Sequence, residues 1–138
     1  MLTPPKSSVE EDAMKIFSML GYTVAHKKVL TGRSGIEHVI DIVVEKAEPI
    51  GNRMILIKCV TFEGKTSLRL DEIIQFWGRI FDIGAPGLII TTCKLTEDAA
   101  RFANFYKLSV IETSGGVDLR NTLMTYQARV FSAEAPFL

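Results

Sequence analysis

The chain has no excess of charge of either sign and no long apolar run. Its 16 Lys and Arg residues balance 16 Asp and Glu residues, so the formal net charge is zero. Because dedicated nucleic-acid binders usually carry a basic excess, strong nonspecific DNA binding by the monomer is disfavoured, although a local basic face is compatible with this balance. No apolar stretch approaches the roughly 18–20 residues that span a bilayer, and residues 1–6 lack the apolar core of a signal peptide. The sequence therefore predicts a cytoplasmic protein with no membrane partner.

Cysteine and histidine are also scarce, with two residues of each. Cys59 and Cys93 lie far apart and lack the spacing of zinc sites or disulfide frameworks, so we expect both to be buried thiols. Apolar residues, in contrast, make up 47% of the 138 residues, which suits a soluble domain with a substantial core. Two prolines near the start predict a flexible lead over residues 1–7, followed by a single domain over residues 8–138.

Apolar periodicity predicts an α/β fold. The expected helices cover residues 8–20, 68–83, 97–106 and 118–129, and the expected strands cover residues 22–30, 37–44, 53–60, 88–92 and 109–112. A short connection containing Pro and Gly predicts that the second and third strands form a hairpin, and strand–helix–strand crossovers follow. The order α-β-β-β-α-β-α-β-α implies one central mixed sheet with helices on both faces.

One carboxylate, Asp41, lies inside the apolar second strand, and Lys58 lies in the third. Alternation of side chains places Val39, Asp41 and Val43 on one face, and in a hairpin Lys58 can lie beside Asp41 on the same surface. Asp41 is either a functional carboxylate or the partner of Lys58 in a structural ion pair, because unpaired carboxylates are rarely buried.

Other side chains can reach this surface from the helices. They are Glu10 or Glu11 on the first helix and Gln75 on the second, although the glutamates also suit a helix N-terminus and Gln75 suits a solvated face. Carboxylates on neighbouring elements are the ligands of Mg²⁺ in phosphodiester hydrolysis, and a nearby lysine can orient water or stabilise developing charge.

The order of elements and several motifs resemble the Mrr-like branch of the PD-(D/E)xK restriction-endonuclease-like superfamily. The resemblance covers about residues 8–120 and is carried by Leu20-Gly21-Tyr22, Gly32–Asp41, Ile55–Val60, Gly87–Thr92, Thr96–Ala103 and Leu108–Glu112. It implies a restriction-endonuclease-like core, Mg²⁺-dependent cleavage of DNA and a homodimer. An apolar helix bearing Phe76, Trp77 and Phe81 also favours a homodimer.

In that family the second-strand Asp and a third-strand (D/E/Q)-x-K bind metal and activate water. Asp41 matches the first element, and His38 is similar to a histidine of relatives, although it suits a structural role as well. The third strand departs from the pattern, because Lys58 stands in the acid position and Val60 in the lysine position. A shift of two residues makes Lys58 the catalytic lysine and leaves Leu56 in place of the acid.

The resemblance therefore implies catalytic roles for Asp41, Lys58, Glu11 and His38, with Mg²⁺ held by Asp41 and Glu11. A DNA-facing rim is predicted from Lys27, Lys28, Arg33, Lys65 and Arg69, and the alternative for these residues is a solvated charged edge. Two alternatives to a nuclease follow from the degenerate third strand. One is a DNA-binding module that keeps the fold without catalysis, and the other is an assembly subunit.

Overall fold

A computed structural model describes residues 8–61 and 67–132, with side chains as far as residue 126. The helices are α1 (Val9–Met19), α2 (Leu70–Ile83), α3 (Glu97–Phe105) and α4 (Gly116–Ser132). The strands are β1 (Thr23–Thr31), β2 (Glu37–Ala47), β3 (Asn52–Val60), β4 (Ser67–Leu68), β5 (Gly87–Thr91), β6 (Lys94–Leu95) and β7 (Ser109–Glu112). No helix in these ranges is long and apolar enough to cross a membrane. The lead predicted over residues 1–7 lies outside the described residues.

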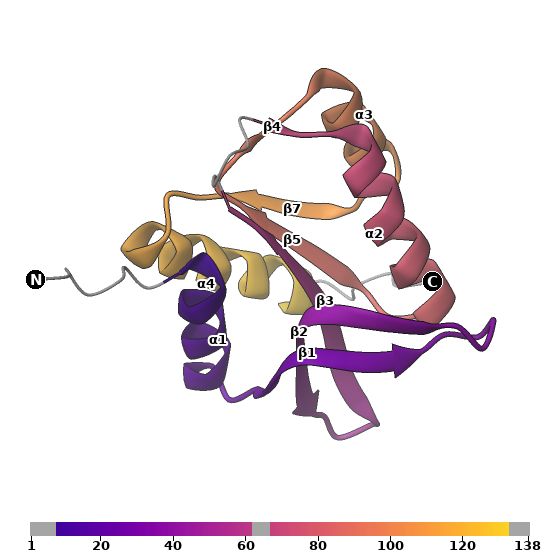
Figure 1. Cartoon of the computed structure of the whole chain (residues 1–138). Helices are drawn as coiled ribbons and strands as arrows, with labels where there is room; N and C mark the ends of the chain where they lie inside the picture. Colours follow the sequence, from indigo (N-terminus) through magenta and orange to yellow (C-terminus); the bar gives the residue numbers. More distant parts are fainter. Residues whose placement is uncertain (1–7, 62–66, 133–138) are drawn as a thin grey trace, which may run out of the picture.

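The central sheet has the order β1-β2-β3-β5-β7, antiparallel from β1 to β3 and parallel from β3 to β7. Figure 1 shows α1 and α4 on one face of this sheet and α2 and α3 on the other. The core has two corresponding clusters, one formed with α1 and α4 and one formed with α2 and α3. The predicted α/β fold with a mixed sheet flanked by helices is confirmed.

The middle strands are apolar along their length because helices cover both of their faces. Ile55, Leu56 and Ile57 of β3 are at most 1% exposed, and residues 88–90 of β5 are fully buried. In the register, Leu56 pairs with Gly87 and Lys58 with Ile89, so Lys58 extends from the most buried part of the sheet. The site predicted on β2 and β3 therefore stands on the most rigidly packed strands.

The pairing of β1 with β2 is interrupted at Asp41. Residues on either side are paired, whereas Lys27, opposite Asp41, is left out of the ladder and has a left-handed φ of 52°. Left-handed backbone is uncommon in residues other than glycine and occurs where the surrounding structure enforces it. Ile40 packs in the cluster under α2, whereas Ile42 packs in the cluster under α1. The alternation of faces along β2 therefore shifts by one residue at Asp41.

This shift contradicts the expectation that Val39, Asp41 and Val43 share one face. Val43 packs in the same cluster as Ile40, and Val39 is 56% exposed. The period-two rule holds only for a regular pleat, and the distortion at Lys27 breaks that pleat.

Two further details differ from the sequence-based expectation. The pair β4 and β6 forms a separate parallel sheet of two residues per strand, which is too short for a periodicity to detect. On α2 the buried residues are Ile73 and Phe76, whereas Ile74 and Phe81 are 43% and 63% exposed. The helix is therefore turned so that Phe76 contacts the sheet.

The packing of α2 against β5 can be tested by substituting two glycines. An added Cβ at Gly87 would lie 2.1 Å from Ile80 Cδ1, so we expect Gly87→Ala to lower the free energy of unfolding by about 1–3 kcal/mol. Gly78 lies within α2, and a Cβ added there would have no atom within 4 Å. Gly78→Ala is therefore expected to raise the free energy of unfolding by about 0.5–1 kcal/mol. Urea denaturation measures the free energy of unfolding of both variants. Changes of the same sign would contradict the packing of α2 against β5.

Candidate nucleic-acid site on β2, β3 and α2

Asp41 lies where β2 separates from β3. Its Oδ2 accepts a hydrogen bond of 3.0 Å from the backbone N–H of Cys59, at a position where the paired ladder between the two strands has ended. The carboxylate is half-buried and takes the place of a backbone acceptor. Asp41 therefore holds the end of β3 in place, and its second oxygen is available for other contacts.

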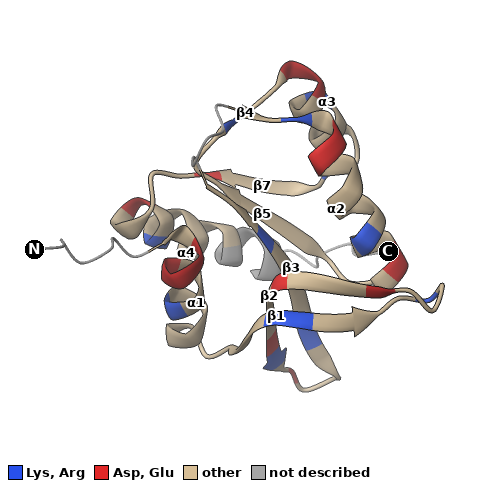
Figure 2. Cartoon of the chain, in the orientation of Figure 1, with Lys and Arg blue, Asp and Glu red and all other residues tan. Residues whose placement is uncertain are grey.

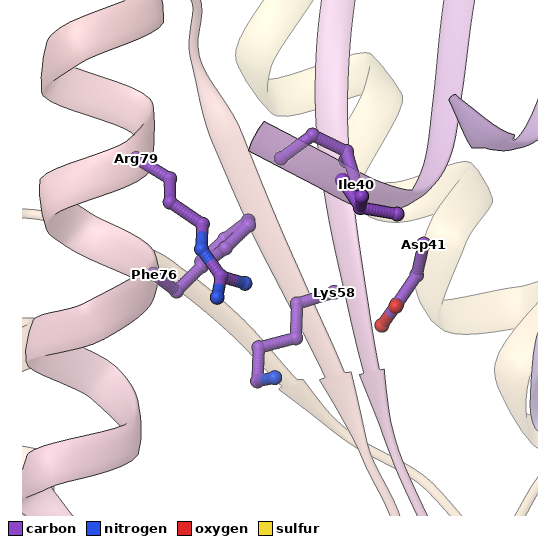
Figure 3. Close-up of a pocket in the computed structure, with 6 residues that line it drawn as sticks. Ile40, Asp41, Lys58, Phe76 and Arg79 are labelled. Carbon is purple, nitrogen blue, oxygen red and sulfur yellow. The ribbon is translucent and has the colours of Figure 1, made fainter. Parts of the chain in front are cut away.

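Lys58 and Asp41 line one small recess, as the sequence predicted for two neighbouring strands. The recess has a volume of about 10 Å³ and is also lined by Val39, Ile40, Phe76 and Arg79. Figure 3 shows the side chains of Lys58 and Arg79 approaching each other from β3 and α2, with Lys58 between Arg79 and Asp41. No ion pair joins Asp41 to Lys58, and neither cation has a hydrogen-bond or ion-pair partner within the described part of the chain.

The first helix places Glu10, rather than Glu11, against the sheet. The Glu10 carboxylate forms a short ion pair with His26 Nε2 of β1. Burial raises the pKa of the Cys59 thiol, and the charges of Glu10 and Asp41 raise it further. Glu11 is exposed and does not line the recess, and its backbone N–H bonds to Ser8 Oγ at 3.0 Å as the capping box predicted.

His38 joins the β1–β2 hairpin to the end of α2. Its Nε2 lies 2.7 Å from Asp82 Oδ2, and the same carboxylate accepts bonds from the backbone N–H and the hydroxyl of Ser34 at 2.9 and 2.7 Å. An added Cβ at Gly32 would lie 1.9 Å from Asp82, so the close approach requires glycine there. The Gly32–Asp41 segment is therefore held by Asp82, and His38 does not line the recess that contains Asp41.

The bonds to His38 and Ser34 lower the pKa of Asp82 from its ordinary 3.8 to about 2. A lowered pKa means that the contribution to stability is complete above the ordinary value and is lost as the pH falls through the folded value. We expect the melting temperature of the native protein to fall between about pH 4 and pH 2 more steeply than that of Asp82→Asn. Asp71→Asn, exposed on the same helix, is the control and should follow the native curve. Parallel curves for Asp82→Asn and the native protein would contradict this anchoring role.

The predicted basic rim is divided among several elements. Lys28 and Arg69 form ion pairs with neighbouring acids at 3.7 and 3.4 Å, and Arg33 donates to carbonyl oxygens at the end of α2. Lys27 is exposed opposite Asp41, and Lys65 lies outside the described residues. Figure 2 shows positive charge dispersed over β1, the hairpin tip, β3 and α2, with acids between them. The cations nearest Asp41 by register or shared recess are Lys27, Lys58 and Arg79.

Comparison with known proteins decides the family. The family model described as restriction endonuclease, Mrr_cat, matches residues 5–123. The chain belongs to this Mrr restriction-endonuclease family. A search of the curated proteins finds no match.

Three solved structures are similar to the chain. A crystal structure of a protein of unknown function, AF1548, is similar at a TM-score of 0.64 and 16% identity, over 85% of this chain and 66% of that one. The restriction endonuclease MspJI, in complex with a 27-mer oligonucleotide, has a TM-score of 0.49 at 14% identity, over 91% of this chain and 28% of that one. The modification-dependent restriction endonuclease AspBHI has a TM-score of 0.47 at 11% identity, over 94% and 40%. The Mrr chain spans less than half of these two enzymes.

Membership in a family of typically metal-dependent endonucleases implies Mg²⁺. Within residues 8–61 and 67–126, no three His, Cys, Asp or Glu side chains are grouped to hold a metal. Magnesium takes oxygen ligands, usually with one or two carboxylates. The recess has a single carboxylate, one oxygen of which accepts from Cys59 N–H, and two cations that have no partner among the described residues. These two positive charges repel a metal ion. This donor set does not fit a divalent cation.

Sequence reasoning missed Arg79 and Asp82. Gln75, the candidate on the same helix, is exposed, whereas Arg79 one turn later lines the recess. The apolar pattern of α2 could have indicated Arg79, because a helix that packs through Ile73 and Phe76 also directs position 79 towards the sheet. Asp82 had no such signal, since its partners lie 44 and 48 residues away in the chain.

Proposed function

We propose that this Mrr-family domain binds the phosphate backbone of DNA without requiring a divalent metal ion. The observation that carries the proposal is the position of Lys58, a cation that lines the recess of Asp41. In one of the two registers of the third strand, this lysine stands where the family motif has an acid. A lysine at this place supplies positive charge to a phosphate without a metal, whereas an acid repels the phosphate unless a metal lies between them. In this proposal the domain keeps the DNA-facing surface of a nuclease and has lost the ligand set for hydrolysis.

The charge of the chain sets the expected strength of binding. With a net charge of zero, affinity has to come from a few local cations, which are Lys27, Lys58 and Arg79 around Asp41. Binding that depends on few phosphate contacts is weak and falls with added salt, with a slope close to the number of contacts. We expect micromolar or weaker affinity for a short duplex at low salt, on the order of the nonspecific binding of other proteins.

A homodimer would double these contacts, and it forms part of the proposal. A continuous aromatic cluster has neighbouring ring centroids 4.7 to 6.1 Å apart and consists of Trp77 and Phe81 of α2, Phe102 of α3, and Tyr106 directly after α3. Phe81 and Tyr106 are 63% and 49% exposed. Exposed aromatic patches are typical of protein interfaces, and sedimentation velocity of the native protein and Phe81→Glu tests whether this one joins two copies.

The alternative function is metal-dependent cleavage of DNA by a divergent site. One observation favours it, because Glu10 contacts His26, and His26 pairs with Ile42, the residue after Asp41 in β2. In that case Asp41 and a glutamate of α1 would hold Mg²⁺, with Lys58 beside the attacking water or the phosphate. The two functions make different predictions for Asp41 once Mg²⁺ is present.

Asp41→Asn is expected to strengthen DNA binding in the presence of EDTA by about threefold to tenfold. The change removes a negative charge next to the bound phosphate, while the amide oxygen can still accept the bond from Cys59 N–H. Fluorescence anisotropy of a labelled duplex at low salt measures the affinity. Asp98→Asn on α3 removes the same charge outside the recess and should change the affinity little. With Mg²⁺ in place of EDTA, weaker DNA binding by Asp41→Asn than by the native protein, together with loss of a Mg²⁺-dependent nicking activity, would favour the nuclease.

A further inference from the structure

The side chains of Lys58 and Arg79 carry like charges and line the same recess, with no acid between them (Figure 3). They come from β3 and α2, both are half-buried, and neither has a hydrogen-bond or ion-pair partner among the described residues. Asp41 lines the same recess, but its Oδ2 is bonded to the backbone N–H of Cys59. Lys58 extends on the side of Arg79 rather than towards Asp41 (Figure 3). Among residues 8–61 and 67–126, these two cations therefore have no acceptor for their donors, and they lie at one point on the surface.

Such a pair favours an anion. Two positive charges held close together repel each other, and partial burial costs each of them hydration. An oxyanion that accepts hydrogen bonds from Lys58 and Arg79 offsets both the repulsion and the lost hydration. A guanidinium suits this role because it can donate two parallel hydrogen bonds to a phosphate. The positive charges of Lys58 and Arg79 also repel a divalent cation from this recess.

The dimensions of the recess identify the part of the ligand that enters it. A volume of about 10 Å³ holds one water-sized atom, and the walls formed by Val39, Ile40 and Phe76 are apolar. One nonbridging phosphate oxygen fits this space, while the phosphorus and the rest of the chain stay at the mouth. A phosphodiester within a DNA strand can make this contact without leaving the duplex, and the apolar walls strengthen its attraction to the two cations.

We propose that Lys58 and Arg79 bind a nonbridging oxygen of a DNA phosphodiester in the place where other nucleases of this fold hold a metal ion. The inference rests on the proposed function, and it adds Arg79, on α2, as a binding residue. Arg79 supplies the fork and Lys58 supplies a point charge, so a change at either residue weakens the contact.

The test compares the affinity of a labelled duplex in EDTA for the native protein, Arg79→Gln, Arg79→Lys and Arg101→Gln. Arg79→Gln should weaken binding at least fivefold and reduce the slope of log affinity against log salt by about one. Arg79→Lys keeps the positive charge without the forked guanidinium, so its affinity for the duplex should lie between those of the native protein and Arg79→Gln. Arg101→Gln, exposed on α3, is the matched control and should bind like the native protein. Melting temperatures confirm that the variants are folded.

A second probe separates the two proposals. Inorganic phosphate is titrated into ¹⁵N-labelled native protein, and the Arg79 Nε–H signal should shift with saturation, whereas Lys58→Gln should reduce that shift. Duplex binding that Arg79→Gln and Lys58→Gln leave unchanged would overturn the inference and leave the proposed function intact. No duplex binding by the native protein would overturn the proposed function, and the anion site would then stand only if the phosphate shift were present. Absence of the shift in the native protein would overturn the anion site.

Discussion

Lys58→Glu is expected to lower the affinity for duplex DNA in EDTA by at least about tenfold and to create binding of Mn²⁺. The change reverses the charge beside Asp41, so a phosphate that met one cation meets a second carboxylate instead. Two carboxylates at one recess are a usual ligand set for Mg²⁺ or Mn²⁺, and Arg79 is then the remaining cation. Anisotropy measures the DNA affinity, and titration calorimetry measures Mn²⁺ binding.

The control for this charge reversal is Lys15→Glu. Lys15 is exposed on α1 and lies outside the recess, so the same change of two charge units there should affect DNA binding much less and should create no metal site. If Lys58→Glu binds DNA as well as the native protein does, Lys58 is not in the DNA-facing site. If the native protein already binds Mn²⁺ as well as this variant, the recess does fit a divalent cation and the account is contradicted.

Ile40→Ala should cost about 2–5 kcal/mol of unfolding free energy, the second large effect. Ile40 is 2% exposed, packs in the cluster under α2 and lines the recess beside Lys58. Truncation removes buried methyl groups at a position held by β1, β2 and α2, so the cavity left behind is not easily filled. Urea denaturation, with the slope checked for constancy, measures the change.

The adjacent residue is the control for this substitution. Val39 is 56% exposed, so Val39→Ala should change the free energy of unfolding by no more than about 0.5 kcal/mol. A regular pleat through Asp41 would place Val39, not Ile40, on the same face as the buried Val43. Equal costs, or a larger cost for Val39→Ala, would therefore contradict the shift of faces at Asp41.

The sequence predicted the architecture because its strongest patterns are those set by burial. Strands β3 and β5 are covered on both faces and appear as apolar runs, and α2 has a clear apolar stripe. The pleat shift at Asp41 could not be predicted, because it depends on the backbone of Lys27 on another strand. The β4–β6 pair could not be predicted either, because two residues do not define a period.

For the site, the sequence identified Asp41 and Lys58 and placed them correctly at one recess. It did not separate Glu10 from Glu11, since consecutive helix positions differ by only about 100° of rotation and capping suits both. The structure pairs Glu10 with His26 and leaves Glu11 exposed. Catalytic, metal and DNA-contact roles for these residues stay predictions, because they depend on ligands rather than on the fold.

Binding of a labelled duplex to the native protein in EDTA, followed as salt is raised, tests the central claim most directly. The account predicts saturable binding without metal, a salt slope of a few units, and no gain in affinity when Mg²⁺ replaces EDTA at matched ionic strength. Binding that appears only with Mg²⁺ or Mn²⁺ and is accompanied by cleavage that Asp41→Ala abolishes would contradict it. The domain would then be a working nuclease of the Mrr family.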